Sequence, residues 1–249
     1  MTWVLYEGDC LEIMPTLSDK SIDMILCDLP YGTTACSWDA VIPFEPLWAQ
    51  YERIIKDNGA IVLTASQPFT TALIASNLSL FRYVWYWHKP YTVGFMNANK
   101  MPLRNIEEIA VFYKALPKYN PQGVIRINKK QFRRKDKAST VYGDMGISDG
   151  EYTQEYSNYP TQLISIGRKG KTEHPTQKPV ALFEYLILTY TDPGDTVMDN
   201  CAGSGTTGVA AENLGRNSIL IEKEPKYCEI IRKRMANRQT TLFEAGVTV

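Results

Sequence analysis

Apolar runs of strand length alternate along this chain with amphipathic stretches of helix length. The runs that predict strands are residues 22–27, 60–64, 83–87, 106–113, 196–198 and 218–221. The stretches that predict helices are residues 47–56, 180–190, 206–214 and 225–237, and one more helix opens at residues 67–69. Strands that alternate with helices are typical of a mostly parallel sheet covered on both faces. We therefore predict an α/β fold with a doubly wound sheet.

The composition is that of a globular protein with balanced charge. Its 249 residues suit one α/β domain that carries an insertion, and 44% of them are hydrophobic, which is enough for a full core. No apolar run approaches about eighteen residues and residues 1–5 lack a signal-peptide pattern, so we expect a cytoplasmic protein without a membrane span. Five cysteines without a C-x-x-C pair and only two histidines lead us to expect neither disulfides nor a metal site.

Residues 115–172 interrupt this alternation. They are rich in Tyr, Gly, Lys, Arg and Asn and have little apolar periodicity. From Lys114 to Lys171 there are twelve basic and five acidic residues, a net charge of +7 in a chain whose total is zero. A basic segment on an otherwise acidic scaffold favours a polyanion-binding element, although a solvated surface loop has the same composition.

A loop of small residues follows the predicted strand at 196–198 and opens the next helix. It reads Asp199-Asn200-Cys201-Ala202-Gly203-Ser204-Gly205-Thr206-Thr207. Small residues allow the backbone to approach a ligand, and the N–H groups of a helix start attract an anion such as a carboxylate. Glu222 ends the following strand, where an acid can accept hydrogen bonds from both ribose hydroxyls. The two features predict a nucleotide-like cofactor but not ATP, since the P-loop lysine is missing; on this motif alone, Glu222 is equally a surface acid beside Lys223.

The turn Asp28-Leu29-Pro30-Tyr31-Gly32 comes directly after a strand that reads as buried. Open α/β sheets bind ligands at this edge. Pro30 fixes its own φ and extends Leu29, so the turn is stiff and carries a carboxylate, a backbone carbonyl and an aromatic ring. Two such acceptors can hold the N–H bonds of an exocyclic base amine and free its lone pair, while Tyr31 stacks on a base that has left the duplex. Taken alone, the same residues also form an ordinary turn that begins with aspartate.

Together these residues resemble the β-class amino methyltransferases of DNA, which are known from restriction-modification systems and phages. The family motif Asp-Pro-Pro-Tyr reads Asp28-Leu29-Pro30-Tyr31 here, and the family's cofactor motif is similar to residues 199–207. Two further segments are similar to the family, His174-Pro175-Thr176-Gln177-Lys178-Pro179 and Gly8-Asp9-Cys10. The resemblance runs from about residue 6 to about residue 237 outside the insertion, with the catalytic motif before the insertion and the cofactor motif after it.

The resemblance implies a Rossmann-like methyltransferase fold in the circularly permuted β order, with S-adenosylmethionine as cofactor. It places residues 1–114 in a catalytic half, 115–172 in a basic target-recognition insertion and 173–249 in a cofactor-binding half. It implies that the catalytic residues are Asp28, Leu29, Pro30 and Tyr31. The residues that it assigns to the cofactor are Asp9, Cys10, His174, Thr176, Lys178, Asp199, Cys201, Ala202, Gly203, Ser204, Gly205, Thr206, Thr207 and Glu222.

Within this cofactor set, the resemblance gives the cofactor adenine to Asp9 and the ribose to Glu222. Thr206, Thr207 and Lys178 would face the methionine carboxylate. Leu29 departs from the usual first proline of the motif but supplies the same backbone carbonyl, and Cys201 is expected to pack against the cofactor. Residues 87–99 are similar to a segment near the family's substrate channel.

The implied reaction is direct transfer of a methyl group to the 6-amino group of adenine, without a covalent enzyme intermediate. An acid at the start of the motif favours adenine, because serine there more often goes with the 4-amino group of cytosine in this class. Methylation of a ring carbon needs a cysteine preceded by proline, and no Pro-Cys pair occurs. The alternatives are action on the cytosine amine, on RNA or on a protein amide, and a DNA-binding module without catalysis.

The expected partner is double-stranded DNA, which would be bound largely through phosphate contacts from basic side chains of the insertion. Many β-class enzymes are dimers, so the resemblance also implies a homodimer. It places the protein in the cytoplasm of a bacterium, an archaeon or a phage-infected host. The candidates for phosphate contacts are Lys129, Lys130, Arg133, Arg134 and Lys135.

Overall fold

The computed structural model describes residues 2–34, 36, 39–133, 150–167 and 177–244. Contacts along the backbone divide the chain into two compact units. Unit 1 combines residues 1–120 with residues 162–249, and unit 2 is formed by residues 121–161. Unit 2 lies inside the segment 115–172 that the sequence marks as an insertion.

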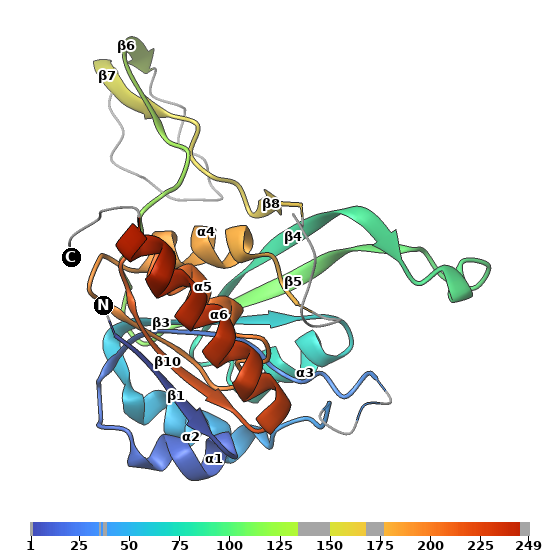
Figure 1. Ribbon diagram of the computed structural model, residues 1–249. Coiled ribbons are helices and arrows are strands. Elements are labelled where there is room, and N and C mark those ends of the chain that lie inside the picture. The colour runs from blue at the N-terminus through green and yellow to red at the C-terminus, as the bar shows by residue number, and fades with distance from the viewer. Residues whose placement is uncertain (1, 35, 37–38, 134–149, 168–176, 245–249) are drawn as a thin grey trace. The chain divides into compact units, whose positions relative to one another are not determined.

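Unit 1 is built on one eight-stranded sheet (Figure 1). Five adjacent strands are parallel to one another: β1 (Trp3–Glu7), β10 (Asn217–Glu222), β9 (Thr196–Asp199), β2 (Ile22–Asp28) and β3 (Ile55–Ala65). β5 (Arg104–Phe112) is antiparallel to both of its neighbours, β3 and β4 (Phe81–Val93). β8 (Leu163–Ser165) pairs with β4 in parallel at the edge. The mostly parallel sheet predicted from the sequence is confirmed.

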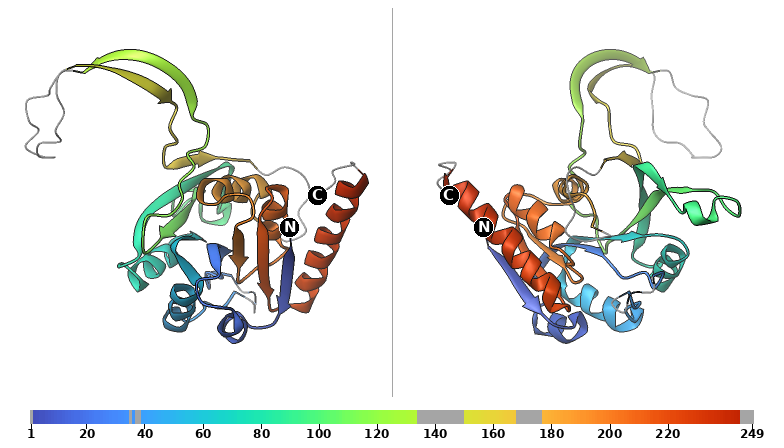
Figure 2. Two further views of the ribbon diagram at one scale, coloured as in Figure 1. Left: turned by 90° about the vertical axis from the view of Figure 1, so that its left-hand side faces the viewer. Right: turned by 45° about the vertical axis from the view of Figure 1, so that its right-hand side comes forward.

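Helices cover both faces of this sheet, because side chains alternate between the faces along each strand. Ile25 and Cys27 of β2 pack with α1 (Cys10–Ile13), α2 (Phe44–Ile54) and α3 (Phe69–Ser76). Met24 and Leu26 pack on the other face with α4 (Val180–Tyr190) and α5 (Thr206–Asn213). On that second face α6 (Pro225–Glu244) lies beside β1 and β10 (Figure 2). Among the described residues, no helix is both long enough and apolar enough to cross a lipid bilayer.

Two regions of unit 1 differ from the sequence pattern. The helix expected over residues 47–56 is α2, which begins earlier, at Phe44, and ends at Ile54. β3 then starts at Ile55, five residues before the strand expected at 60–64, because Ile55 pairs with Ile22 of β2. β1 and α1 were not predicted. β1 is an edge strand with mostly exposed side chains, and its pairing with β10 rather than its own pattern makes it a strand.

Unit 2 contains an antiparallel pair of strands, β6 (Ile125–Arg133) and β7 (Gly150–Ser157). The register shifts between Arg126 and Lys129, where Asn128 has a φ of 46°, as in a β-bulge. The described side chains of both strands are exposed or half-buried. Neither strand has a buried face, and apolar and polar residues alternate only over the four residues 125–128, so the sequence did not predict them.

Candidate active site

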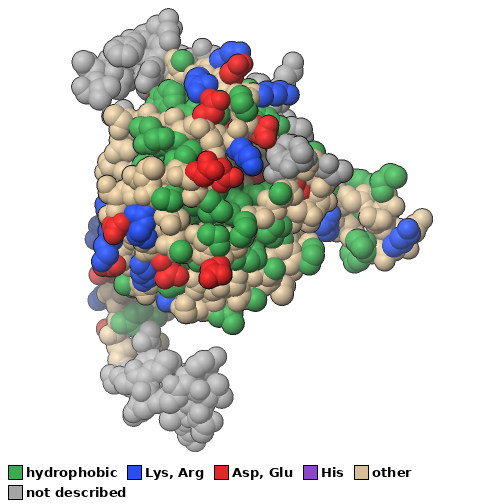
Figure 3. Space-filling model, turned by 90° about the horizontal axis from the view of Figure 1, so that it is seen from below, with side chains coloured by type: hydrophobic (Ala, Val, Ile, Leu, Met, Phe, Trp, Pro, Cys, Tyr) green, Lys and Arg blue, Asp and Glu red, His purple; other side chains and the backbone are tan. Residues whose placement is uncertain are grey.

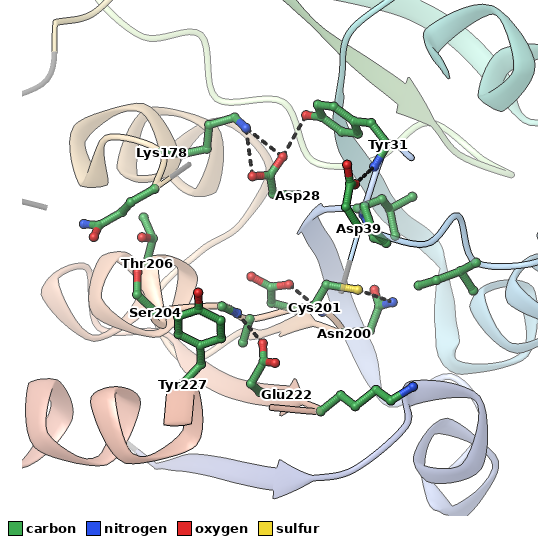
Figure 4. A pocket seen from close by; sticks show the side chains of 18 of the residues that line it. Asp28, Tyr31, Asp39, Lys178, Asn200, Cys201, Ser204, Thr206, Glu222 and Tyr227 are labelled. Carbon is green, nitrogen blue, oxygen red and sulfur yellow. Dashed lines mark hydrogen bonds and ion pairs between the residues drawn. The ribbon is translucent and has the colours of Figure 1, made fainter. Parts of the chain in front are cut away.

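The carboxyl ends of the parallel strands in unit 1 surround a cavity of about 670 Å³ (Figure 4). Small-molecule sites span roughly 300–1,000 Å³. The structure brings the turn after β2 and the loop after β9 to this one cavity, although about 170 residues separate them in the chain. The predicted site residues that line it are Asp9, Cys10, Asp28, Leu29, Pro30, Tyr31, Lys178, Asp199, Cys201, Ala202, Gly203, Ser204, Thr206 and Glu222.

Asp28 is the last residue of β2, and three side chains donate hydrogen bonds to its carboxylate. The Lys178 ammonium lies 2.7 Å from Oδ1 and 2.8 Å from Oδ2. The Tyr31 hydroxyl donates to Oδ1 at 2.7 Å. The Thr64 hydroxyl donates to the same oxygen, because the pairing of β2 with β3 sets Thr64 beside Asp28. These donors hold the carboxylate in one orientation at the cavity wall.

Four charged side chains of alternating sign form a row in this wall: Asp28, Lys178, Glu107 of β5 and Lys89 of β4. Lys178 Nζ lies 3.4 Å from Glu107 Oε2, and Lys89 Nζ lies 2.7 Å from Glu107 Oε1. Both lysines are buried. Burial by itself lowers the pKa of Lys178, but the carboxylates of Asp28 and Glu107 raise it above its usual value. The ammonium therefore stays charged, and each charge in the row is compensated by its neighbour.

Glu107 lines the cavity, and one of its two carboxylate oxygens has no well-formed hydrogen bond. Its Oε2 is buried and accepts no hydrogen bond from the described part of the chain, because 3.4 Å from Lys178 Nζ is longer than a normal N–H···O contact. Since buried acceptors are nearly always satisfied in folded proteins, this oxygen is suited to accept a closer contact from the Lys178 ammonium.

The backbone that follows Asp28 is organised by Asp39. Its carboxylate accepts the N–H groups of Tyr31 at 2.8 Å, Gly32 at 2.9 Å, Thr33 at 2.9 Å and Thr34 at 2.6 Å. Burial by itself raises the pKa of Asp39, but the hydrogen bonds from Thr34, Gly32 and Thr33 lower it below its usual value. The ionised carboxylate thus holds the turn in a defined shape.

The ring of Tyr31 already has protein partners in this structure. It stacks on Phe69 with ring centroids 5.2 Å apart and an interplanar angle of 26°, and the Lys178 ammonium lies 5.5 Å from its centroid. Burial, followed by the charges of Asp28 and Glu107, raises the pKa of Tyr31 well above its usual value, so its hydroxyl remains a donor. For Tyr31 to stack on a base, Lys178 or the ring itself would have to move.

The loop after β9 is held by two carboxylates. Asp199 is 3% exposed and accepts from the backbone N–H of Cys201 and from the Thr207 hydroxyl. Glu222, at the end of β10, accepts the N–H groups of Gly203 at 2.6 Å and Glu224 at 2.9 Å. Burial raises the pKa of Asp199 to about 6 and also raises the pKa of Glu222. Both acids therefore keep protons more readily than exposed carboxylates do.

Two glycines allow this loop to turn into α5. Gly203 has a φ of 52° and Gly205 a φ of 79°, conformations that disfavour other residues. A Cβ on Gly205 would also lie 3.0 Å from the Ile231 side chain of α6. The first turn of α5 starts directly after Gly205, so its N–H groups face the cavity region where Ser204 and Thr206 also lie (Figure 4).

Cys201 packs partly buried against the core beneath the cavity. Hydrogen bonding to Cys10 and Cys27, together with burial, raises the pKa of Cys201 well above its usual value. The thiol therefore stays protonated, which suits the packing role predicted for it and not that of a nucleophile.

Several predicted residues have surroundings that the sequence did not anticipate. Lys178 and Thr207 were expected to face a cofactor carboxylate, but the Lys178 ammonium binds Asp28 and the Thr207 hydroxyl binds Asp199. Gly205 shapes the loop without lining the cavity. The Asp9 carboxylate accepts the Leu11 N–H and caps α1, while Asp9 also lines the cavity. His174 and Thr176 lie outside the described residues.

The predicted phosphate-binding residues belong to unit 2. Lys129 and Lys130 are on β6 and are exposed. The Arg133 side chain, Arg134 and Lys135 lie outside the described residues.

The sequence reasoning missed Asp39, Thr64 and Glu107, and it placed Lys89 only within the segment 87–99 that is similar to one near the family's substrate channel. Glu107 is a charge inside the apolar run at 106–113, where a buried acid requires a partner. Asp39 and Thr64 have no local signature, because the residues that they bond come from other parts of the chain.

Comparison with known proteins identifies relatives along nearly the whole chain. A family model described as DNA methylase (N6_N4_Mtase) matches residues 22–233. The type II methyltransferase M2.MboI of Moraxella bovis is 27% identical over 258 residues, which cover 92% of this chain and 86% of that protein. M.HinfI of Haemophilus influenzae, also a type II methyltransferase, is 28% identical over 267 residues, covering 93% of this chain and 67% of that protein.

Two solved structures share the fold. The M1.HpyAVI–SAM complex has a TM-score of 0.63 and 25% identity, covering 94% of this chain and all of that one. PvuII DNA methyltransferase, described as cytosine-N4-specific, has a TM-score of 0.64 and 18% identity, covering 91% of this chain and 84% of that one. At 18% identity the second likeness concerns the fold alone.

Proposed function

This chain belongs to the DNA methylase family and is an S-adenosylmethionine-dependent DNA N-methyltransferase of the restriction-modification type, and we propose that its target is the 6-amino group of adenine. The observation that carries the proposal is the Asp28 carboxylate, which is held by Lys178, Tyr31 and Thr64 in the same cavity as the loop around Gly203. A reactive amine and a methyl donor can therefore meet in one enclosed space.

The residues at the ends of β9 and β10 fit S-adenosylmethionine. Gly203 exposes its backbone without a side chain, the start of α5 suits a carboxylate, and the buried acids Asp199 and Glu222 suit a ligand with positive charge and hydroxyl donors. We assign the ribose to Glu222, the adenine to Asp9 and the methionine carboxylate to Ser204 and Thr206. When bound, the cofactor supplies an electrophilic methyl group on a sulfonium.

Asp28 and the Leu29 carbonyl act on the amine of the target base. As two fixed acceptors they hold its N–H bonds and favour a tetrahedral nitrogen whose lone pair attacks the methyl group. In the transfer the N–C bond would form as the S–CH₃ bond of the bound cofactor breaks, and Asp28 or solvent would take the proton that the amine loses. The acceptors are positioned before reaction, so catalysis comes mainly from orientation and electrostatics.

The target base enters this cavity by leaving the duplex. Asp28 is half-buried at the end of a central strand, and a base inside a DNA stack cannot bring its amine there. In this structure the Lys178 ammonium is paired with the Asp28 carboxylate. For the amine of the base to bind Asp28, the ammonium must share this carboxylate with it or move away. The buried Oε2 of Glu107 lies next in the row and can keep the displaced ammonium paired.

Adenine is favoured over cytosine because the catalytic turn begins with an acid. The experiment is incubation of unmethylated duplex DNA with cofactor labelled in the methyl group, followed by chromatography of the nucleosides. We expect label in N6-methyladenosine, loss of that label in Asp28→Ala, and retention in Asp57→Ala, which removes an exposed acid. Label in N4-methylcytosine would contradict the adenine assignment, and label only in added RNA would contradict the DNA substrate.

A further inference from the structure

The hairpin between β4 and β5 ends in an exposed apolar tip. β4 ends at Val93, the short helix η2 (Phe95–Asn97) follows, and β5 begins at Arg104. Phe95 is 66% exposed, Met96 97% and Met101 53%. We call these three residues the apolar tip. The hairpin projects from unit 1 (Figure 1), and hydrophobic and basic side chains gather at its end, at the right of Figure 3.

The backbone of this tip is ordered by its own hydrogen bonds. Gly94, with a φ of 95°, reverses the chain. The N–H groups of Asn97 and Ala98 donate to Gly94 and Phe95, and those of Lys100 and Met101 both donate to the Asn97 carbonyl. A turn that is already formed presents its side chains to a partner with little further loss of conformational entropy.

The chemistry of the tip indicates what that partner is. Single exposed hydrophobic residues scattered over a protein surface are common and need no explanation. Three of them gathered at one projecting turn form a patch, which indicates an interaction. No acid occurs from Pro90 to Leu103, while Lys100 is on the tip and Arg104 follows it. Apolar side chains flanked only by cations suit a surface that combines stacked rings with phosphates, which is duplex DNA.

The apolar tip follows in the chain directly after residues that line the cavity. Tyr91 and Val93 of β4 line the cavity, and Phe95 follows two residues later. Two residues span at most roughly 7 Å, so Phe95 lies within a distance comparable to two base steps of Val93. A duplex whose target base enters the cavity would bring its neighbouring base pairs to the tip.

We propose that the apolar tip is a wedge that inserts into duplex DNA beside the extruded base, with Phe95 and Met96 filling the stack and Lys100 and Arg104 contacting phosphates. The inference rests on the proposed function, because it requires a base to leave the duplex. When these side chains fill the gap that the extruded base leaves in the stack, they oppose the return of the base. The fraction of DNA in the reactive geometry therefore rises.

The test compares methyl transfer to a paired and a mismatched target. The recognition site is first mapped on plasmid DNA that the wild-type enzyme has methylated. Two duplex oligonucleotides are then made that contain this site, one with the target base paired and one with it mismatched. We expect Phe95→Ala/Met96→Ala to lose at least about tenfold in kcat/KM on the paired duplex and to regain most of it on the mismatch, where extrusion costs less. Phe95→Leu, which keeps an apolar side chain, is expected to retain most activity.

Leu78→Ala is the matched control, since Leu78 is 67% exposed in the loop before β4 and distant in sequence from the tip. It should not change either rate. Cofactor titration and sedimentation show that each variant is folded and report its oligomeric state. An equal loss on both substrates, or no loss on either, overturns the wedge.

A shift of the double variant to a smaller species, with equal loss on both substrates, would assign the tip to contact between copies of this chain instead. A wild-type protein that binds cofactor but methylates no DNA would refute the proposed function itself. That result differs from failure of the wedge alone, in which the wild-type enzyme is active and the variants match it.

Discussion

The carboxylates around the cavity are stabilised by different kinds of partner. Asp28 is held by side-chain donors with a full positive charge among them, whereas Glu222 is held by backbone N–H groups. Asp199 has hydrogen bonds but no ion pair among the residues that the structure describes, and burial is the largest influence that raises its pKa to about 6. Substitutions at these residues should therefore respond differently to pH.

Replacing Lys178 with Met removes the cation between two carboxylates. We expect the free energy of unfolding at pH 8 to fall by about 3–5 kcal/mol, because Asp28 and Glu107 are left without their shared charge. Denaturation in urea measures this loss. We also expect kcat to fall, since the Asp28 carboxylate loses the ammonium that holds its orientation.

The double variant Lys178→Met/Asp28→Asn removes both charges of one ion pair and leaves Lys89 paired with Glu107. It should regain part of the lost stability. Lys20→Met is the control, because Lys20 pairs with Asp57 on the surface and such pairs contribute little. Equal unfolding free energies for wild type and Lys178→Met from pH 5 to 8 would show that the row of charges does not act as described.

The raised pKa of Asp199 predicts a pH dependence of cofactor binding. The folded state holds this proton more tightly than the unfolded chain, so ionising Asp199 costs stability as pH rises from about 4 to 6, and the cost is constant above that. Ionisation also adds a negative charge beside a cationic ligand. Affinity for S-adenosylmethionine should therefore rise from pH 5 to 7, approaching tenfold per unit on the acid side.

Calorimetric titration measures this dependence, with S-adenosylhomocysteine as the matched ligand that lacks the sulfonium charge. The rise should be smaller for that ligand and should disappear in Asp199→Asn. If Asp199→Asn keeps the wild-type slope, another group, such as Glu222, carries the titration.

At the scale of elements, the cavity depends on loops that single acids organise. Asp39 gathers four backbone N–H groups of the turn after β2, including that of Tyr31. The backbone of the turn is thereby tied to a residue that follows it in the chain, in addition to the contacts of the Tyr31 side chain with Thr64 of β3 and Phe69 of α3.

Asp39→Ala should loosen this turn. We expect a loss of about 1–3 kcal/mol in unfolding free energy, because four backbone N–H groups lose their ionised acceptor. We also expect a lower kcat, since Tyr31 and the adjoining Asp28 are no longer held. The pKa of Asp39 is lowered, so its contribution is present above the usual value of 3.8 and is lost as pH falls through the lowered pKa.

Asp57→Ala is the control for this effect, because Asp57 is exposed and pairs only at the surface. Urea denaturation and steady-state rates distinguish the two variants. Comparable results for Asp39→Ala and Asp57→Ala would mean that the four hydrogen bonds do not determine the shape of the turn.

At the scale of the whole molecule, unit 1 carries the cavity and unit 2 carries exposed basic residues on β6. We propose that the segment 115–172 is a target-recognition insertion and that Lys129 and Lys130 contact phosphates. Each phosphate contact adds about 0.9 to the slope of log K against log salt. Lys129→Ala/Lys130→Ala should therefore weaken binding to all sequences and lower that slope by about two.

Filter binding over a salt series measures both quantities. Lys20→Ala/Lys56→Ala, which removes two lysines that pair with acids of unit 1, should leave the slope near that of the wild type. The same slope for the Lys129→Ala/Lys130→Ala variant and the wild type would exclude these lysines from the DNA contact.

The sequence by itself determined the turn at Asp28, the loop at Gly203 and, except for the short strand β8, the order of the strands and helices of unit 1 from β2 onwards. These features depend on local properties: the period of apolar residues, the fixed φ of Pro30 and the positive φ open to glycine. The antiparallel pair in unit 2 and the edge strand β1 escaped prediction because neither buries a full face, so no period appears in their residues.

Only the tertiary structure decided what these local features contact. Lys178 meets Asp28 across 150 residues of chain, and Lys89 meets Glu107 because β4 and β5 lie side by side. Charges of this kind are buried only when an opposite charge reaches the same place, and which charges meet depends on the order of strands in the sheet. A local pattern cannot contain that order, and so the row of charges at the cavity wall was absent from the prediction.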